Sequence, residues 1–173
     1  SPLYSAYIFQ DEMRSEQQAL HLYQGGIGLP DRDYYFNSDA RTVTIRMEYD
    51  NHLKAMFMLM GDDSIKATAN AATVVRMEKA LAKSSRKLED LRDPYLNYNK
   101  MQFDGLKSLT PSIDWQLMFE GMNVKGIDSI IVGQPDFFKE VEKSLKANSI
   151  DDWKVYLRWN LINGLADYLS APF

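Results

Sequence analysis

The chain contains no cysteine, and this absence removes two classes of site. Neither a disulfide nor a thiolate-bound metal ion can be built from its 173 residues. Only two histidines are present, His21 and His52, and neither begins a His-Glu-x-x-His motif. A histidine-rich metal site is therefore excluded, and we expect both histidines to be surface or half-buried residues.

The chain also lacks long apolar runs and an excess of positive charge. No run approaches the roughly 20 residues of a membrane span. The net charge of −4 argues against nucleic acid as a partner, because a phosphate backbone attracts basic surfaces. Apolar residues make up 45% of the chain and charged residues 25%, which is typical of globular proteins with a packed core.

The residue patterns of common active sites are missing as well. There is no Gly-x-Ser-x-Gly nucleophile motif. The glycines within 25–28 do not form a phosphate-binding loop, because no Gly-Lys-Ser/Thr follows them. The acidic pairs Asp62-Asp63 and Asp151-Asp152 stand at predicted helix starts, where capping explains them. We expect neither a catalytic residue nor a metal ligand in this chain.

The periodicity of apolar residues predicts a mainly α fold: a helical domain with a short N-terminal β-hairpin and one further short strand. The hairpin is expected at Ser5–Gln10 and Gln17–Gln24, and the further strand at 127–132. Residues 95–101 follow Asp93-Pro94 and are expected to be extended or irregular. Helices are predicted at 40–60, 65–91, 102–109, from 114 onward, at 137–147 and at 153–169. The last helix has a broad apolar stripe, which predicts burial on more than one side.

Three lysines of the second predicted helix, Lys79, Lys83 and Lys87, are spaced four apart. This spacing is compatible with an anion-binding strip or with an ordinary solvated helix face. Acidic neighbours such as Glu78 dilute the positive charge, and this favours the solvated face.

The sequence GGIGLPDRDYYF, at residues 25–36, combines turn-forming residues with three aromatics. A structural interpretation uses the glycines and Pro30 for a turn, with Asp31 and Asp33 as caps. In the same interpretation Arg32 pairs with one of these carboxylates, and the aromatics at 34–36 anchor the loop on the core. A functional interpretation instead places Arg32 and Tyr34 on a wall that faces substrate.

Five blocks of the chain, in order, resemble the neprilysin-type zinc endopeptidases, a family that includes the endothelin-converting enzymes and bacterial relatives. GIGLPDRDYY resembles the family's Gly-Leu-Pro-x-Arg-Asp-Tyr-Tyr stretch. The other four blocks are RDPYLNYNKM at 92–101, IDWQLMF at 113–119, IIVGQPDFFKEV at 130–141 and WKVYLRWNLI at 153–162. The resemblance covers nearly the whole chain.

The resemblance implies a longer parent protein with a catalytic lobe and a largely helical covering lobe. Zinc in such enzymes is bound by a His-Glu-x-x-His helix and a downstream glutamate in the C-terminal half, and no counterpart of these residues is present here. We therefore expect residues 1–173 to be a single piece of the N-terminal covering region that binds no zinc itself. Residues 95–101 are expected to be a linker between the lobes.

The function implied by the resemblance is to shape the substrate chamber of a peptidase and to restrict it to peptides. The implied partners are the missing catalytic lobe and peptide substrates, and exposed apolar surface predicts self-association of the isolated piece. The expected chamber or signature residues are Arg32, Asp33, Tyr34, Tyr35, Tyr98 and Asn99. The alternative is a stand-alone helical module that binds a protein or peptide. Animal ectodomains of the family are rich in disulfides, so the lack of cysteine favours a bacterial parent, which we expect to be extracytoplasmic.

Overall fold

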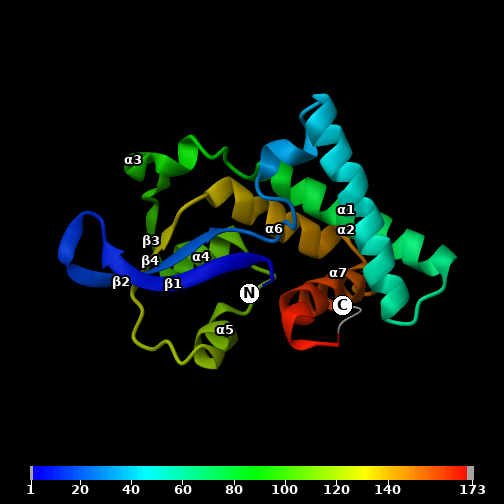
Figure 1. The fold of residues 1–173 in the computed structure, drawn as a ribbon. Coiled ribbons are helices and arrows are strands. Elements are labelled where there is room, and N and C mark those ends of the chain that lie inside the picture. Colours follow the sequence, from blue (N-terminus) through cyan, green and yellow to red (C-terminus); the bar gives the residue numbers. More distant parts are fainter. Residues whose placement is uncertain (1, 171–173) are drawn as a thin grey trace. The chain divides into compact units, whose positions relative to one another are not determined.

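A computed structural model describes residues 2–170, and these residues form two compact units. Unit 1 contains residues 3–26 and 84–147, and unit 2 contains residues 27–83 together with those from Asn148 onward. The fold is mainly α with an N-terminal hairpin, as predicted (Figure 1). None of the described helices is both long enough and apolar enough to cross a membrane.

The sheet of unit 1 has four strands in the order β1-β2-β4-β3. The predicted hairpin is formed by β1 (Tyr4–Asp11) and β2 (Arg14–Gln24), and the predicted further strand is β4 (Ser129–Val132). A short strand that was not predicted, β3 (Lys100–Gln102), pairs antiparallel with β4. β4 runs parallel to β2 and carries three fully buried apolar residues at 130–132, which fits its central place in the sheet.

A 3-10 turn, η2 (Asp90–Arg92), and four α-helices complete unit 1. The α-helices are α3 (Pro94–Asn97), α4 (Phe103–Leu109), α5 (Trp115–Gly121) and α6 (Pro135–Ala147). The prediction that 95–101 is extended or irregular is wrong for its first part. The Asp93 carboxylate accepts hydrogen bonds from the backbone N–H groups of Tyr95 and Leu96, and this cap starts α3 directly at the proline.

Aromatic side chains fill much of the core of unit 1. The ring centroid of Tyr4, from β1, lies 5.4 Å from that of Trp115 and 5.7 Å from that of Phe138. Trp115 also packs against Phe119, with ring centroids 5.7 Å apart. These tilted ring pairs join β1, α5 and α6.

Unit 2 is built from helices. They are a 3-10 turn η1 (Arg32–Tyr35), α1 (Ala40–Leu59), α2 (Ser64–Ser84), α7 (Ile150–Leu165) and a final 3-10 turn η3 (Ala166–Tyr168). Asp39 caps α1 and Ser149 caps α7 with a complete capping box. Gly61 ends the first long helix, with a φ of 92° that favours glycine.

The second long helix ends at Ser84, so the predicted extension to residue 91 is wrong. The side-chain amide of Gln24 explains the early end. It accepts a hydrogen bond from the backbone N–H of Arg86 at 2.7 Å and donates one to the carbonyl of Arg86 at 3.1 Å. These two bonds replace the helical hydrogen bonds of the same backbone groups.

The core of unit 2 is formed by side chains of α1, α2 and α7. Its fully or nearly fully buried residues are Leu53, Met56, Phe57, Ala67, Ala71, Val74 and Trp159. The expectation that α7 is buried on more than one side is wrong in this structure. Tyr156 and Trp159 are buried, whereas Leu157, Leu161 and Leu165 on the other side are exposed.

Candidate functional site

Residues 25–36, here called the signature block, fold into a turn that is held by the phenol of Tyr35. The Tyr35 hydroxyl accepts hydrogen bonds from the backbone N–H groups of Gly28 and Leu29, both at 3.1 Å. It also donates a hydrogen bond of 2.8 Å to Oε2 of Glu78 on α2. Tyr35 is nearly fully buried, so this single group closes the loop and fixes it to a helix.

Glu78 is a buried carboxylate with two phenol donors. Besides the bond from Tyr35, the Tyr49 hydroxyl of α1 lies 2.8 Å from Oε1 and 2.9 Å from Oε2. Only 1% of Glu78 is exposed. The cluster of Tyr35, Tyr49 and Glu78, here called the phenol–carboxylate cluster, therefore joins the turn, α1 and α2.

Burial controls the protonation of this cluster. Desolvation raises the pKa of Glu78 from 4.5 to about 7, although the hydrogen bonds from Tyr35 and Tyr49 oppose the shift. Burial and the nearby Glu78 carboxylate also raise the pKa of both phenols. The cluster therefore holds one proton-binding carboxyl group that changes its charge close to neutral pH.

Gly28 makes room for the cluster. A Cβ atom at this position would lie 2.0 Å from the Tyr49 hydroxyl oxygen and 3.1 Å from Oε1 of Glu78. Any side chain at position 28 would displace Tyr49, so glycine is required here to let the Tyr49 side chain approach the backbone closely.

Arg32 and Asp33 are engaged within the same turn. Nε of Arg32 donates to the carbonyl of Ala82 at 3.2 Å, and its Nη1 lies 3.6 Å from Oδ1 of Asp33. Asp31 caps the turn by accepting from the backbone N–H of Asp33 at 2.8 Å. The structural interpretation is thus confirmed for the cap at Asp31, whereas the Asp33 carboxylate is the one with which Arg32 pairs.

The three aromatics of the block have different positions. Tyr35 is buried, Tyr34 is half-buried and Phe36 is exposed. The carbonyl of Tyr34 accepts a hydrogen bond of 2.8 Å from Nη1 of Arg46 on α1. The expectation that all three rings anchor the loop is therefore wrong for Phe36, whose ring instead lies 5.7 Å from the Arg32 guanidinium carbon.

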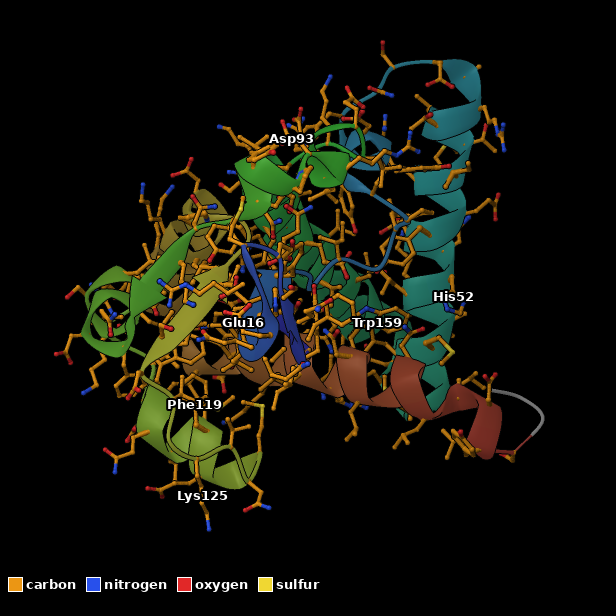
Figure 2. The ribbon with its side chains drawn as sticks, turned by 90° about the vertical axis from the view of Figure 1, so that its left-hand side faces the viewer. Glu16, His52, Asp93, Phe119, Lys125 and Trp159 are labelled. Atoms are coloured by element: carbon orange, nitrogen blue, oxygen red, sulfur yellow. The ribbon has the colours of Figure 1, made fainter. Side chains whose placement is uncertain are left out.

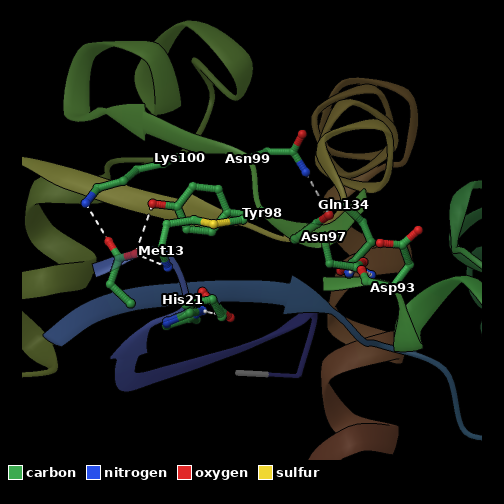
Figure 3. Close-up of polar contacts among 11 residues, drawn as sticks. Met13, His21, Asp93, Asn97, Tyr98, Asn99, Lys100 and Gln134 are labelled. Carbon is green, nitrogen blue, oxygen red and sulfur yellow. Dashed lines mark hydrogen bonds and ion pairs between the residues drawn. The ribbon is translucent and has the colours of Figure 1, made fainter. Parts of the chain in front are cut away.

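Tyr98, in unit 1, belongs to a second polar cluster around Asp11 (Figure 3). The Tyr98 hydroxyl donates a hydrogen bond of 2.9 Å to Oδ1 of Asp11. Nζ of Lys100 donates one of 2.6 Å to Oδ2, and the backbone N–H of Met13 donates one of 3.0 Å to Oδ1. Asp11 is fully buried at the hairpin end, so this cluster ties the hairpin to β3.

Three hydrogen-bond donors determine the charge state of Asp11. Burial alone would raise its pKa, but the hydrogen bonds from Lys100, Met13 and Tyr98 outweigh this effect and lower the pKa to about 2. Asp11 is therefore a carboxylate throughout the physiological pH range.

Asn99 follows Tyr98 in the sequence, and two backbone carbonyls hold its side chain. Its side-chain amide donates to the carbonyls of Leu96 and Gly133, each at 3.1 Å (Figure 3). Nη1 of Arg86 donates to the same two carbonyls, at 2.7 and 3.0 Å. Residues 96–99 are thereby fixed to the end of β4.

A polar hollow of about 530 Å³ adjoins Tyr98 in unit 1. It is lined by Arg14, Gln17, Tyr98, Lys100, Met101, Gln102, Asp128 and Ser129. The structure therefore places Tyr98, but not Asn99, on the wall of this hollow.

The two histidines lie in different surroundings. Within residues 2–170, no group of three or more His, Asp or Glu side chains converges as metal ligands do. His52 is exposed as expected, and its ring lies 5.6 Å from that of Trp159 (Figure 2). The expectation is wrong for His21, which is fully buried because the hairpin register stacks it on Tyr7, with ring centroids 5.3 Å apart.

Two central residues of these clusters, Glu78 and Asp11, were not predicted from the sequence. A signal for Glu78 was present, because it shares the helical spacing of the buried residues Val74, Met77 and Leu81. No comparable local signal marks Asp11, whose partners Tyr98 and Lys100 are nearly 90 positions away.

The whole chain is similar in sequence to one group of peptidases. The profile of the N-terminal region of peptidase family M13 matches residues 1–173. Neprilysin-3 of Drosophila melanogaster is 30% identical over 182 residues, which include 99% of this chain and 23% of that protein. Endothelin-converting enzyme 1 of Rattus norvegicus is 29% identical over 182 residues, which include 100% of this chain and 23% of that protein.

Solved structures show the same similarity. The zinc metalloprotease ZMP1 of Mycobacterium tuberculosis, in its open state, is 28% identical with a TM-score of 0.91, over 98% of this chain and 26% of that chain. PepO of Lactobacillus rhamnosis, 20% identical with a TM-score of 0.79 over 97% of this chain and 27% of that chain, shares the fold. The chain spans about a quarter of the length of these relatives. The predicted resemblance is confirmed, and the chain belongs to peptidase family M13.

Proposed function

We propose that residues 1–173 are a non-catalytic part of a larger zinc metallo-endopeptidase, in which they shape the substrate chamber and restrict it to peptides. The observation that carries this proposal is the similarity to ZMP1, a zinc metalloprotease, over 98% of this chain but only 26% of that protein. Such coverage fits a part that works together with a larger remainder of the same polypeptide.

The geometry of the signature block supports a scaffolding role. Tyr35 binds two backbone N–H groups and Glu78, and Arg32 binds the carbonyl of Ala82. These groups are used to fix a turn, whereas a catalytic acid or base must reach a substrate atom within hydrogen-bond distance.

Zinc does not fit the residues that the structure describes, because these residues contain no converging set of ligands. In this proposal the metal is bound by a part of the parent protein outside residues 1–173. Bound there, zinc would supply Lewis-acid chemistry for peptide hydrolysis.

Two of the predicted residues are suited to the chamber wall. The side chain of Arg32 is 23% exposed, and Tyr98 lines the polar hollow of unit 1. In our proposal each of these side chains faces peptide from its own unit, with Tyr35 supporting the turn that carries Arg32 and Asn99 supporting the segment that carries Tyr98. Residues 95–101 connect to the catalytic lobe, which is the principal partner.

The experiment is a peptidase assay with an internally quenched peptide on two proteins, the full-length parent and the 173-residue chain. We expect the parent to cleave the peptide, to lose activity with a chelator and to regain it with added zinc. The 173-residue chain should remain inactive with zinc, and stoichiometric hydrolysis by it would overturn the proposal. A reading frame that ends near residue 173 would also overturn it, and would favour a stand-alone binding module.

A further inference from the structure

α7 carries an apolar stripe on its exposed side. Its members are Ile150, Leu157, Leu161 and Leu165, here called the outer stripe. They are 76%, 45%, 64% and 43% exposed. Their spacing of seven, four and four residues keeps them on one face of an α-helix over about four turns.

The outer stripe lies opposite the buried side of the helix. At 3.6 residues per turn, Leu161 is about 200° around the axis from Trp159, which is 1% exposed. α7 therefore has two apolar faces, of which only the one with Trp159 is covered within the described residues. A helix that is apolar on opposite faces is typical of an element packed between two layers.

Gly164 lies within the outer stripe, between Leu161 and Leu165. A Cβ atom built at this position meets no other atom within 4 Å. The described residues therefore leave open space at this position, where glycine is destabilising in a helix relative to alanine.

The margin of the stripe is polar, as at a buried interface. Nζ of Lys154 pairs with Oδ1 of Asp151 at 3.1 Å beside Ile150 and Leu157. Lys154 falls on the same face of the helix between Ile150 and Leu157, so the uninterrupted apolar part of the stripe consists of Leu157, Leu161 and Leu165. Contiguous exposed apolar side chains with a polar rim mark a contact surface.

We propose that the outer stripe is an internal interface, covered in the parent protein by an apolar helix from the polypeptide outside residues 1–173. This proposal rests on the proposed function, in which the chain is part of a longer enzyme. The relatives are about four times as long as this chain, so most of their length is available to supply the helix.

A segment of the same polypeptide fits this surface better than a second copy of the chain. Four partly exposed aliphatic side chains present well under the roughly 800 Å² per partner that a stable complex buries. A covalently linked helix needs less area, because linkage gives it a high effective concentration.

The test is thiol labelling of single-cysteine variants of the full-length parent. Leu157→Cys and Leu161→Cys lie in the stripe, and Asp151→Cys, on the same helix but beside the stripe, is the matched control. We expect a maleimide to label both stripe cysteines at least about tenfold more slowly than the control, at every protein concentration. Equal labelling rates for the stripe and control cysteines would overturn the proposal. Protection that disappears on dilution, as a dimer dissociates, would also overturn it.

Gly164→Ala provides a second measurement that does not depend on labelling. If the stripe is covered, the added methyl group should lower the thermal unfolding midpoint of the parent. A raised midpoint would overturn the proposal, because alanine favours an uncovered helix. If the stripe cysteines are protected from maleimide but the parent has no peptidase activity, the proposed function is refuted and the interface is not. If the stripe cysteines are labelled as fast as the control in an active peptidase, only the interface is refuted.

Discussion

The Tyr35 hydroxyl donates a hydrogen bond of 2.8 Å to Oε2 of Glu78, and the two residues are 43 positions apart in the sequence. The same oxygen of Tyr35 accepts two backbone N–H groups of the signature turn. The bond thus makes the shape of the turn depend on a carboxylate in the middle of α2. The same bond explains why the signature block, whose residue types suggest a functional site, has a structural role.

Replacing Tyr35 with Phe should destabilise the protein by about 2–3 kcal/mol. The change removes one hydroxyl but leaves two backbone N–H groups and a buried carboxylate without that partner, and unpaired buried polar groups are costly. Urea denaturation followed by circular dichroism measures the free energy of unfolding.

The neighbouring substitution Tyr34→Phe is the matched control. Tyr34 is half-buried, and the hydrogen bond that fixes it uses its backbone carbonyl, which the change leaves intact. We expect a loss below about 0.5 kcal/mol, as for ordinary surface substitutions. Equal losses for the two variants would contradict the role assigned to the Tyr35 hydroxyl.

The stability of the protein should fall as the pH rises from 5 to 7.5. The pKa of Glu78 is about 7 in the folded state, above its ordinary value of 4.5, so the folded protein binds this proton more tightly than the unfolded chain. The contribution is fully present below pH 4.5 and is lost as the pH rises through 7. The expected loss is on the order of 2–3 kcal/mol in the free energy of unfolding.

Glu78→Gln isolates this effect, because the amide does not titrate. The difference in unfolding free energy between the native protein and the variant should change with pH only across this window. The other shifted carboxyl groups, such as Asp11 with a pKa of about 2, titrate below it. A difference that is constant from pH 5 to 7.5 would show that Glu78 is not the group responsible.

Much of the fold could be predicted from local sequence signals. The hairpin, the capping residues Asp39 and Ser149 and the terminal Gly61 all act within a few residues of their position. The end of α2 could not be predicted, because the Gln24 side chain that binds Arg86 is 62 positions away. β3 was missed for the same reason, since three residues become a strand only by pairing with β4.

The candidate residues show the same limit. The family resemblance indicates Arg32, Asp33 and Tyr35 as chamber or signature residues, but it does not indicate which groups they contact. In the sequence Glu78 is an acidic neighbour that dilutes the charge of the lysines and favours a solvated helix face, whereas a buried carboxylate needs partners. Its phenol partners come from η1 and α1, and only the folded chain brings them to α2.

Gly28→Ala should destabilise the protein by about 2 kcal/mol or more. The new methyl carbon would lie 2.0 Å from the Tyr49 oxygen, so Tyr49 must move and release Glu78. Gly121→Ala, at the end of α5, is the control because a Cβ atom there meets no atom within 4 Å. Thermal unfolding of both variants should show a lowered midpoint for Gly28→Ala alone, and two unchanged midpoints would contradict the predicted clash.

Asp11→Asn should destabilise the protein by about 1–3 kcal/mol at pH 7, because it removes the charge that accepts from Lys100 and Tyr98. Asp104→Asn, which breaks an exposed pair with Lys107, should cost less than about 0.5 kcal/mol.

The effect of Asp11 should also depend on pH. Its pKa is lowered from 3.8 to about 2 in the folded state, so its contribution is present above pH 3.8 and is lost as the pH falls through 2. The gap in unfolding free energy between the native protein and Asp11→Asn should therefore narrow between pH 4 and 2. A gap of constant size over this range would mean that the substitution acts through lost shape or packing, and the charge of Asp11 would then have no role in joining the hairpin to β3.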